Sequence, residues 1–213
     1  MQAIIFDFDG TLADSELCSV FATQNAFQKC QVVMPSQEQI TYYMGIPIEE
    51  SFHAMSDRPL SDDEFQQLLT QFRSDYKQIE LTALRVFPAI PDLLHALQQR
   101  NIACFVLSSK KSDVLYRNLK QLDIAHYFTD YIGSDLVTSY KPHPDGIFKL
   151  CEKHQLVAAN CLMVGDAIFD IQMGHAAGTK TCAVSWGSHS KEKLLTEKPT
   201  FYIEHALDLL AII

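Results

Sequence analysis

Short apolar runs alternate with longer amphipathic segments over most of the chain. Four runs of four to six residues are largely apolar, as strands buried on both faces of a sheet are; they are Ala3–Phe8, Ile102–Leu107, Cys161–Val164 and Thr181–Val184. Between them, apolar residues recur at helical spacing in four segments, which are Pro91–Arg100, Asp113–Leu122, Asp145–His154 and Ile168–Ala177. Strands that alternate with helices predict an α/β fold with a doubly wound parallel sheet.

The segment from Ser15 to Leu84 breaks this alternation, because it contains no run typical of a strand. It carries four amphipathic helical patterns, which are Glu16–Lys29, Gln37–Met44, Glu49–Met55 and Asp62–Ile79. The last begins after Ser61, and Glu64 follows three residues later, which is the pattern of a capping box. We therefore expect an inserted α-helical domain of residues 15–84, with residues 1–14 and 85–213 forming the core. Helices that only decorate the surface of the core are the alternative.

Composition and charge narrow the range of partners. The 213 residues, 47% hydrophobic and 20% charged, are those of an ordinary globular protein with room for one catalytic domain and an insertion. A net charge of −9 argues against nucleic acid or an anionic membrane as the main partner, because both require a basic face. No apolar run approaches the roughly 18 residues of a membrane span. We expect a monomer or a homodimer.

The start of the chain and the pattern of its cysteines indicate the cell compartment in which we expect the protein. Met1 and Gln2 lead directly into an apolar run without the basic region of a signal peptide. Six cysteines are scattered along the chain and none forms a C-x-x-C pair, which favours reduced thiols over disulfides or zinc ligands. Both features predict a cytoplasmic protein.

The first candidate for chemistry is the pair Asp7 and Asp9, in the pentapeptide Asp-Phe-Asp-Gly-Thr that ends the first apolar run. On a strand, side chains at this spacing share a face and lie about 7 Å apart. Two carboxylates at the end of a buried strand repel each other and lose hydration, so a cation or a proton must compensate. An ordinary Asp-Gly turn is the alternative.

Three further signals stand at the ends of predicted elements. Ser108 follows the second apolar run, at the sheet edge where ligands bind in open α/β folds, although a helix cap would also place a serine there. Lys141 precedes two prolines that stiffen the chain and could direct its ammonium inward, unlike an ordinary surface lysine. Asp166 follows the third run, and Asp170 would share its helix face, where acidic residues also serve as dipole partners.

Together, these signals resemble the haloacid dehalogenase-like superfamily, whose pattern is D-x-D-G-T, a Ser or Thr, a distant Lys and then G-D-x-x-x-D. All four motifs occur in that order, and the resemblance covers essentially the whole chain. It implies a Rossmann-like core with a C1-type helical cap. The glycines and turn residues at Gly10–Ser15 and Val86–Ile90 predict hinges between cap and core. The run K-P-x-P-D at Lys141–Asp145 and the sequence Ala176-Ala177-Gly178 are similar to the phosphoglycolate phosphatase-like branch. The implied activity is that of a phosphatase acting on a small phosphorylated metabolite.

The resemblance also implies roles for individual residues. Asp7 would be the nucleophile that forms a phospho-aspartyl intermediate, and Asp9 would be the general acid and base. Lys141 would neutralise both the nucleophile and the phosphate, and Ser108 would hydrogen-bond the phosphoryl oxygens. The residues expected to contact the substrate are Gly10, Ser108, Ser109 and Lys141.

The expected cofactor is Mg²⁺. By resemblance, Asp7, Asp166 and the backbone carbonyl of Asp9 would bind it, while Asp170 would act through water or by orienting Lys141. The charges agree, because four carboxylates and one lysine leave three negative charges that would repel a phosphate dianion. One Mg²⁺ and a proton on Asp9 would cancel them, and ligands that are all oxygen suit Mg²⁺.

Alternatives remain on the same core. A phosphosugar mutase or an inorganic pyrophosphatase would use similar motifs, but mutases usually carry an arginine shortly after a cap glycine, where this chain has isoleucine after Gly45. A receiver-like or phosphate-sensing module is the alternative that is not an enzyme. The apolar loop Met44–Pro47 suggests a small or partly apolar leaving group. His143 could approach the substrate, and Trp186–Gly187 is expected to serve packing.

Overall fold

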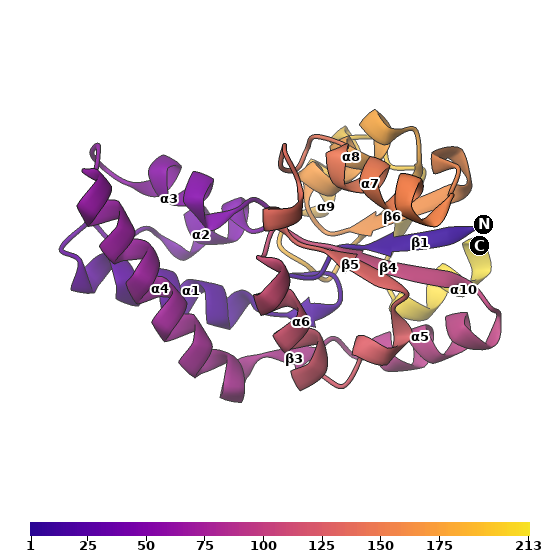
Figure 1. Cartoon of the computed structure of the whole chain (residues 1–213), viewed down its shortest axis with the longest axis horizontal. Coiled ribbons are helices and arrows are strands. Elements are labelled where there is room, and N and C mark those ends of the chain that lie inside the picture. The colour runs from indigo at the N-terminus through magenta and orange to yellow at the C-terminus, as the bar shows by residue number, and fades with distance from the viewer.

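A six-stranded parallel sheet forms the centre of the larger part of the molecule (Figure 1). The computed structural model describes residues 1–213, and the strand order is β5-β4-β1-β6-β7-β8. The strands are β1 (Ala3–Phe6), β4 (Ala103–Leu107), β5 (Asp130–Ile132), β6 (Cys161–Gly165), β7 (Lys180–Val184) and β8 (Phe201–Ile203). In β1, Phe6 lies opposite Val106 of β4 on one side and Val164 of β6 on the other. The predicted parallel α/β sheet is confirmed.

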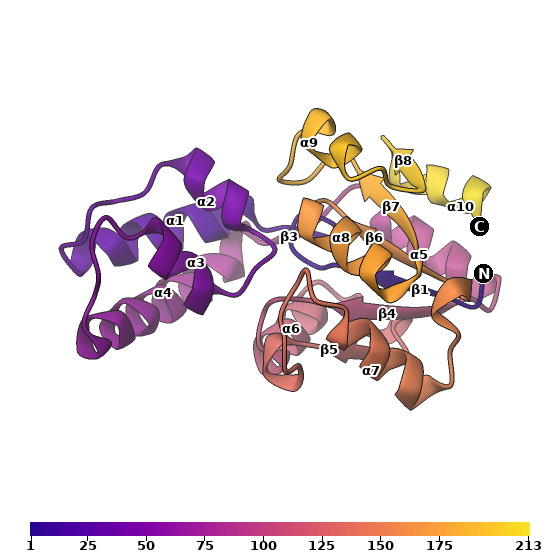
Figure 2. The same cartoon turned by 90° about the horizontal axis from the view of Figure 1, so that it is seen from above.

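Helices cover both faces of the sheet (Figures 1 and 2). On one face lie α5 (Ile90–Gln99), α6 (Ser112–Gln121) and α10 (Leu209–Ile212), and on the other lie α7 (Asp145–His154) and α8 (Ile168–Ala177), with α9 (Lys191–Thr196) beyond α8. Side chains of β1 alternate between the two layers: Ile4 and Phe6 belong to the large apolar cluster that includes leucines of α5 and α6, whereas Ile5 packs with residues of α7 and α8. The sheet is therefore doubly wound, as predicted. Short 3-10 helices complete the connections at Ala125–Tyr127, Ser134–Leu136, Ala158–Asn160 and Ala206–Asp208.

Four helices between β1 and the second sheet strand in sequence, β4, form a separate layer at the end of the molecule opposite the chain termini (Figures 1 and 2). They are α1 (Glu16–Lys29), α2 (Gln37–Tyr43), α3 (Ile48–Met55) and α4 (Asp62–Ala83), and we call them the helical cap. Phe52 contacts Phe27 and Phe72 edge-to-face, and so links α3 to α1 and α4. The capping box at the start of α4 is confirmed, because the Ser61 N–H donates to a Glu64 carboxylate oxygen at 2.8 Å.

The segments that join the helical cap to the sheet pair with each other. Strand β2 (Ala13–Asp14) runs antiparallel to β3 (Arg85–Val86), and the Phe87 N–H donates to the Leu12 carbonyl at 3.1 Å. A second connection is the Glu80 carboxylate of α4, which accepts hydrogen bonds from Arg117 and Asn118 of α6 at 2.7 to 3.1 Å. None of the helices combines the length and the apolar character that a membrane span requires.

The first strand is shorter than predicted. It ends at Phe6 rather than at Phe8, because the Phe8 carbonyl accepts hydrogen bonds from the N–H groups of Leu12 and Ala13 and the chain turns. Gly10, with φ +81°, allows this turn. The carboxylates of Asp7 and Asp9 therefore do not stand on a continuous strand.

Candidate active site

The predicted motifs converge at the carboxyl edge of the sheet. Asp7 follows β1, Ser108 follows β4 and Asp166 follows β6, and β4 and β6 are the two neighbours of β1. After β1 the chain builds outward through β4 and β5, and then returns to the other side of β1 with β6. A reversal of this kind opens a crevice in a parallel sheet, and ligands bind there.

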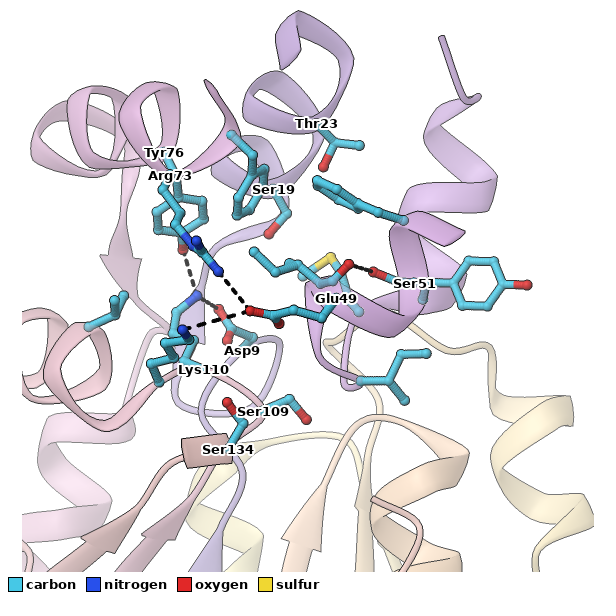
Figure 3. A pocket seen from close by; sticks show the side chains of 18 of the residues that line it. Asp9, Ser19, Thr23, Glu49, Ser51, Arg73, Tyr76, Ser109, Lys110 and Ser134 are labelled. Atoms are coloured by element: carbon cyan, nitrogen blue, oxygen red, sulfur yellow. Dashed lines mark hydrogen bonds and ion pairs between the residues drawn. The ribbon is translucent and has the colours of Figure 1, made fainter. Parts of the chain in front are cut away.

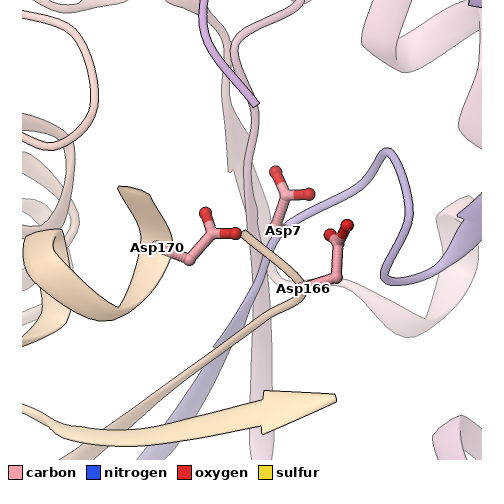
Figure 4. Close-up of side chains that lie close together, drawn as sticks. All are labelled: Asp7, Asp166 and Asp170. Carbon is pink, nitrogen blue, oxygen red and sulfur yellow. The ribbon is translucent and has the colours of Figure 1, made fainter. Parts of the chain in front are cut away.

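Three aspartates meet in this crevice (Figure 4). Asp7, Asp166 and Asp170 are all buried, and each offers one carboxylate oxygen such that these oxygens lie within 4.8 Å of one another. Asp166 is held by the Thr11 hydroxyl at 2.8 Å and by the N–H and hydroxyl of Ser188, both at 2.7 Å. Asp170 accepts from the N–H at the start of its own helix, at 3.1 Å. The carboxylates are therefore positioned by hydrogen bonds from several segments.

Lys141 lies among these carboxylates. Its ammonium donates to Asp7 at 2.5 Å and to Asp170 at 2.8 Å, and its side chain is only 4% exposed. Burial alone would lower the pKa of Lys141, but the neighbouring charges of Asp170 and Asp7 raise it above its ordinary value. The lysine is therefore charged. It stands just before α7, and its peptide bond to Pro142 is cis.

The cluster has an excess of negative charge. Burial raises the pKa of Asp7 well above its usual range, and the charges of Asp170 and Asp166 add to this effect, while Lys141 opposes it. Burial also raises the pKa of Asp166. The second oxygen of Asp7 is buried and has no hydrogen-bond partner. An unpartnered carboxylate oxygen beside two further carboxylates fits a divalent cation with oxygen ligands, and this is the donor set that Mg²⁺ uses.

Asp9 belongs to a second cluster that reaches the helical cap (Figure 3). Its carboxylate accepts from the Lys110 ammonium at 2.7 Å and from the Ser15 hydroxyl at 2.5 Å. Lys110 also donates to the Tyr76 hydroxyl of α4 at 2.8 Å and lies over the ring of that residue. Burial would lower the pKa of Lys110, but Asp9 and Tyr76 raise it.

Lys110 was not identified as a site residue from the sequence. The signal that could have found it is its place two residues after Ser108, at the same sheet edge. Thr11 and Ser188, which hold Asp166, were also missed. Thr11 lies within the first motif, whereas Ser188 is more than twenty residues from Asp166 and follows no motif.

Three other residues were also predicted to contact the substrate, and each makes a hydrogen bond within the protein. They are Ser108, Ser109 and Gly10. Ser108 is buried at the sheet edge, and its hydroxyl accepts from the Lys110 N–H at 3.1 Å. The Ser109 hydroxyl donates to the Gly45 carbonyl of the helical cap at 2.6 Å. The Gly10 N–H donates within its own turn, and a Cβ at Gly10 would lie 2.2 Å from Asp166. Gly10 is therefore required for the close approach of Asp166, and its contact with substrate stays a prediction.

Three other residues singled out in the sequence make contacts in this region. His143 accepts from the Asp145 N–H at 3.2 Å in the first turn of α7 and is exposed. Trp186 packs on Phe87 and donates to the Thr11 carbonyl at 3.0 Å, in agreement with the packing role expected for it. A Cβ at Gly187 would lie 2.1 Å from Asp166, so this glycine also leaves room for the aspartate.

A cavity of about 420 Å³ separates the helical cap from the sheet edge (Figure 3). Asp9 and Lys110 lie at its core side, together with Ser109 and Ser134, and all four cap helices contribute to its opposite wall. A ligand in this cavity would contact Asp9 directly. The cavity therefore lies between Asp9 and the cap.

Comparison with known proteins agrees with this arrangement. The family model described as haloacid dehalogenase-like hydrolase matches residues 4–184 of the chain. Pyrophosphatase PpaX of Bacillus pumilus is 30% identical, and the match covers 100% of this chain and 96% of that protein. Phosphoglycolate phosphatase of Vibrio parahaemolyticus is 29% identical over 100% of this chain and 96% of its own. A solved haloacid dehalogenase-like hydrolase of Streptococcus pneumoniae, 30% identical, has a TM-score of 0.87 and covers 100% of this chain and 98% of that one.

Proposed function

The chain belongs to the haloacid dehalogenase-like hydrolase family, and on that premise we propose that it is a Mg²⁺-dependent phosphatase that hydrolyses phosphate monoesters through a phospho-aspartyl intermediate on Asp7. One observation carries this proposal. Asp7 lies at the carboxyl edge of the sheet with one oxygen bound by Lys141 and the other unpartnered beside two carboxylates. A carboxylate so placed can be paired with a cation and with a phosphoryl group.

The same geometry supports different roles for the two parts of the chain. We assign residues 1–14 and 85–213 to the catalytic core and residues 15–84 to the cap. The core supplies every carboxylate and the lysine of the buried cluster. The cap covers part of the cavity above Asp9 and would limit the access of water to the reacting groups. The segments Gly10–Ser15 and Val86–Ile90 would act as hinges.

The metal would be held by Asp7, Asp166 and the backbone carbonyl of Asp9. Asp170 already accepts a hydrogen bond from Lys141, which supports its role in orienting that lysine. When bound, Mg²⁺ would neutralise negative charge on the phosphoryl oxygens and on the carboxylates around them. Its two positive charges would also offset the excess negative charge of the carboxylates in the cluster.

In the first step, a carboxylate oxygen of Asp7 attacks phosphorus, and the bond from phosphorus to the ester oxygen breaks. Asp9 donates a proton to that leaving oxygen. Lys141 and the Ser108 hydroxyl stabilise charge on the transferred group. In the second step, Asp9 takes a proton from a water molecule, which attacks phosphorus, releases inorganic phosphate and regenerates the Asp7 carboxylate.

The test is release of phosphate from a panel of esters, with and without Mg²⁺, that contains 2-phosphoglycolate, pyrophosphate, hexose phosphates and nucleotides. Turnover that depends on Mg²⁺ is expected. The variant Asp9→Asn should release a burst of about one nitrophenolate per active site from p-nitrophenyl phosphate, because this leaving group needs little protonation while the water step still needs the base. Wild-type turnover of aryl and alkyl esters by this variant would exclude the acid and base role.

Hydrolysis of pyrophosphate is the second candidate, and it is favoured by the similarity to pyrophosphatase PpaX over the whole chain. The same attack by Asp7 would release phosphate as the leaving group. The panel separates the two, because a pyrophosphatase would prefer pyrophosphate over every organic ester. A mutase would instead move phosphate between positions of a sugar without net release. The receiver-like alternative is not favoured, because the matching family is one of hydrolases.

A further inference from the structure

The cavity above Asp9 is the feature of this molecule that neither the motifs nor the reaction explains (Figure 3). We call the part of the cavity beside Asp9 and Lys110 its mouth, and Lys111 also belongs to the lining. The ion pair between Arg73 and Glu49 of the cap adds further charge. The cap also contributes apolar side chains, which are Ile40, Met44, Ile48, Phe52, Met55 and Phe72. The cavity therefore has both charged and apolar parts.

The cavity is larger than the reaction itself requires. Its volume of about 420 Å³ falls in the range of roughly 300–1,000 Å³ that sites for whole organic ligands occupy. Glycolate has two carbons, and pyrophosphate has only a second phosphate as its leaving group. Either would leave the cap wall uncovered. The size therefore favours a leaving group that extends from Asp9 toward Phe52 and Phe72.

The chemistry of the wall narrows the class of leaving group. Ile46 and Ile48 line the cavity and are only partly buried, so their apolar surface meets water. An apolar wall gains free energy when an apolar group displaces water from it. The hydroxyls that α1 and α3 add to the lining belong to Ser19, Thr23 and Ser51, and Ser51 makes one hydrogen bond of 3.4 Å within its own helix. A hydroxyl group placed against Ile46 and Ile48 would lose its hydrogen bonds to water, whereas an apolar group would lose none.

We propose that the cavity binds the leaving group of the substrate, and that this group is an alcohol with an extended apolar body, aliphatic or aromatic, that packs against Ile46, Ile48 and Phe72. The inference rests on the proposed phosphatase activity and adds the class of its substrate. The phosphate stays at the sheet edge with Asp7 and Lys141, while the cations at the mouth attract the phosphate dianion. The apolar loop Met44–Pro47 contributes Met44 and Ile46 to the lining, in line with a partly apolar leaving group.

The test is a series of n-alkyl phosphates from ethyl to hexyl, assayed with Mg²⁺. The leaving oxygen is almost equally reactive across the series, so kcat/KM reports contact with the cavity. It should rise roughly twofold to fourfold for each methylene that leaves water, and then level off. Hydrolysis of every member with equal kcat/KM would overturn the apolar substrate class and leave the phosphatase intact. Hydrolysis of no ester would overturn both.

Variants of one cap position sharpen the test. Ser51→Leu fills part of the cavity, so the ratio of kcat/KM for hexyl over ethyl phosphate should fall at least fivefold, while Ser51→Ala should keep the wild-type ratio. The matched control is Ser74→Leu, the same substitution at an exposed position of α4 outside the cavity lining. An unchanged ratio in a folded Ser51→Leu would overturn the assignment of the cavity. If Ser51→Leu unfolds, competitive inhibition of the wild type by n-alkylphosphonates decides, because their affinity should rise with chain length in the same way.

Discussion

Two lysines at the sheet edge, Lys141 and Lys110, each form an ion pair with an aspartate, but their surroundings differ. Lys141 binds two carboxylates, Asp7 and Asp170, and all three residues belong to the core. Its side chain is 4% exposed. Every partner of Lys141 lies in the buried layer of the sheet edge, so the position of the cap does not enter into this cluster.

Lys110 also binds a carboxylate, but its second partner is the Tyr76 hydroxyl of the cap. Its side chain is 13% exposed and borders the cavity. The two clusters differ in what they connect: the Lys141 cluster joins core to core, and the Lys110 cluster joins core to cap. In the proposed mechanism, the first cluster would hold the reacting groups, while the second links Asp9 to the cap through Lys110 and Tyr76.

The largest expected effect lies in the Lys141 cluster. Asp7→Asn removes the proposed nucleophile without changing the size of the side chain, and activity should fall by roughly 10³-fold or more. The measurement is phosphate release from an ester that the wild type hydrolyses. Asp92→Asn, on the exposed side of α5, is the matched control and should stay active. Substantial activity of a pure Asp7→Asn preparation would show that Asp7 is not attacked.

Removal of metal should have a comparable effect on activity and a separate effect on stability. In excess chelator, turnover should fall to background, because the acidic cluster would then repel phosphate. Added Mg²⁺ should raise the Tm of the wild type, since a ligand at about 100 times its Kd stabilises a protein by roughly 2.7 kcal/mol. Asp166→Asn should lose most of this rise in Tm. An equal rise in both proteins would place the metal elsewhere.

The pH dependence of stability tests the buried charge of Asp7. Burial raises the pKa of Asp7 in the folded protein, so its protonated form contributes stability that is complete below the ordinary pKa and is lost as the pH rises through the folded value. The asparagine in the variant Asp7→Asn cannot ionise, so the variant does not lose stability in this way as the pH rises. In chelator, Asp7→Asn should therefore have the higher Tm at pH 7, and the difference should shrink toward about pH 4. Scanning calorimetry across this range would contradict the assignment if the two Tm curves were parallel.

An intermediate effect is expected in the Lys110 cluster. Lys110→Met leaves Asp9 without its cation, and kcat/KM should fall roughly tenfold to a hundredfold, as for loss of a hydrogen bond to a charged group. Tyr76→Phe removes only the hydroxyl and should cost about fivefold. If the tyrosine acts through Lys110, the double variant should resemble Lys110→Met alone. Independent, multiplying effects would show that the cap residue does not act through the lysine.

The smallest effect on turnover is expected where α4 of the cap is anchored to α6, at the border of the cavity. Glu80 is 1% exposed on its side chain and pairs with Arg117, which is 38% exposed. Arg117→Met should lower the free energy of unfolding by about 1–3 kcal/mol, less than for a fully buried pair because the arginine is partly solvated. The control is Arg58→Met, which breaks the exposed pair with Glu64 and should lower the free energy of unfolding much less. Urea unfolding that gave equal losses would show that burial of Glu80 adds nothing.

The longer helices and strands could be predicted from the sequence because each contains several repeats of its hydrophobic pattern. The predicted ranges of α1, α7 and α8 agree with the observed helices, and β4, β6 and β7 differ from prediction by one residue at one end. The three-residue strands β5 and β8 were not predicted. Three residues show too little alternation to identify a strand, and these segments become strands because β4 and β7 offer them open edges to pair with.

By itself, the sequence determined the parallel sheet, the helical insertion and the order of the motifs along the chain. It also identified four residues that the structure brings into one cluster, which are Asp7, Lys141, Asp166 and Asp170. These predictions rest on short segments whose hydrophobic period, or whose place at the end of a strand, is local. Strand ends at the same edge of a parallel sheet necessarily lie near one another.

Only the tertiary structure decided which charges pair and how deep the cavity above them is. Lys110 meets Asp9 from 101 positions away and Tyr76 from 34 positions away, and no local pattern encodes such contacts. The apolar wall of the cavity comes from three cap helices whose inward faces read in the sequence as ordinary core. Whether an apolar face meets another helix or a space for a ligand depends on how the helices pack, and this is a property of the folded chain alone.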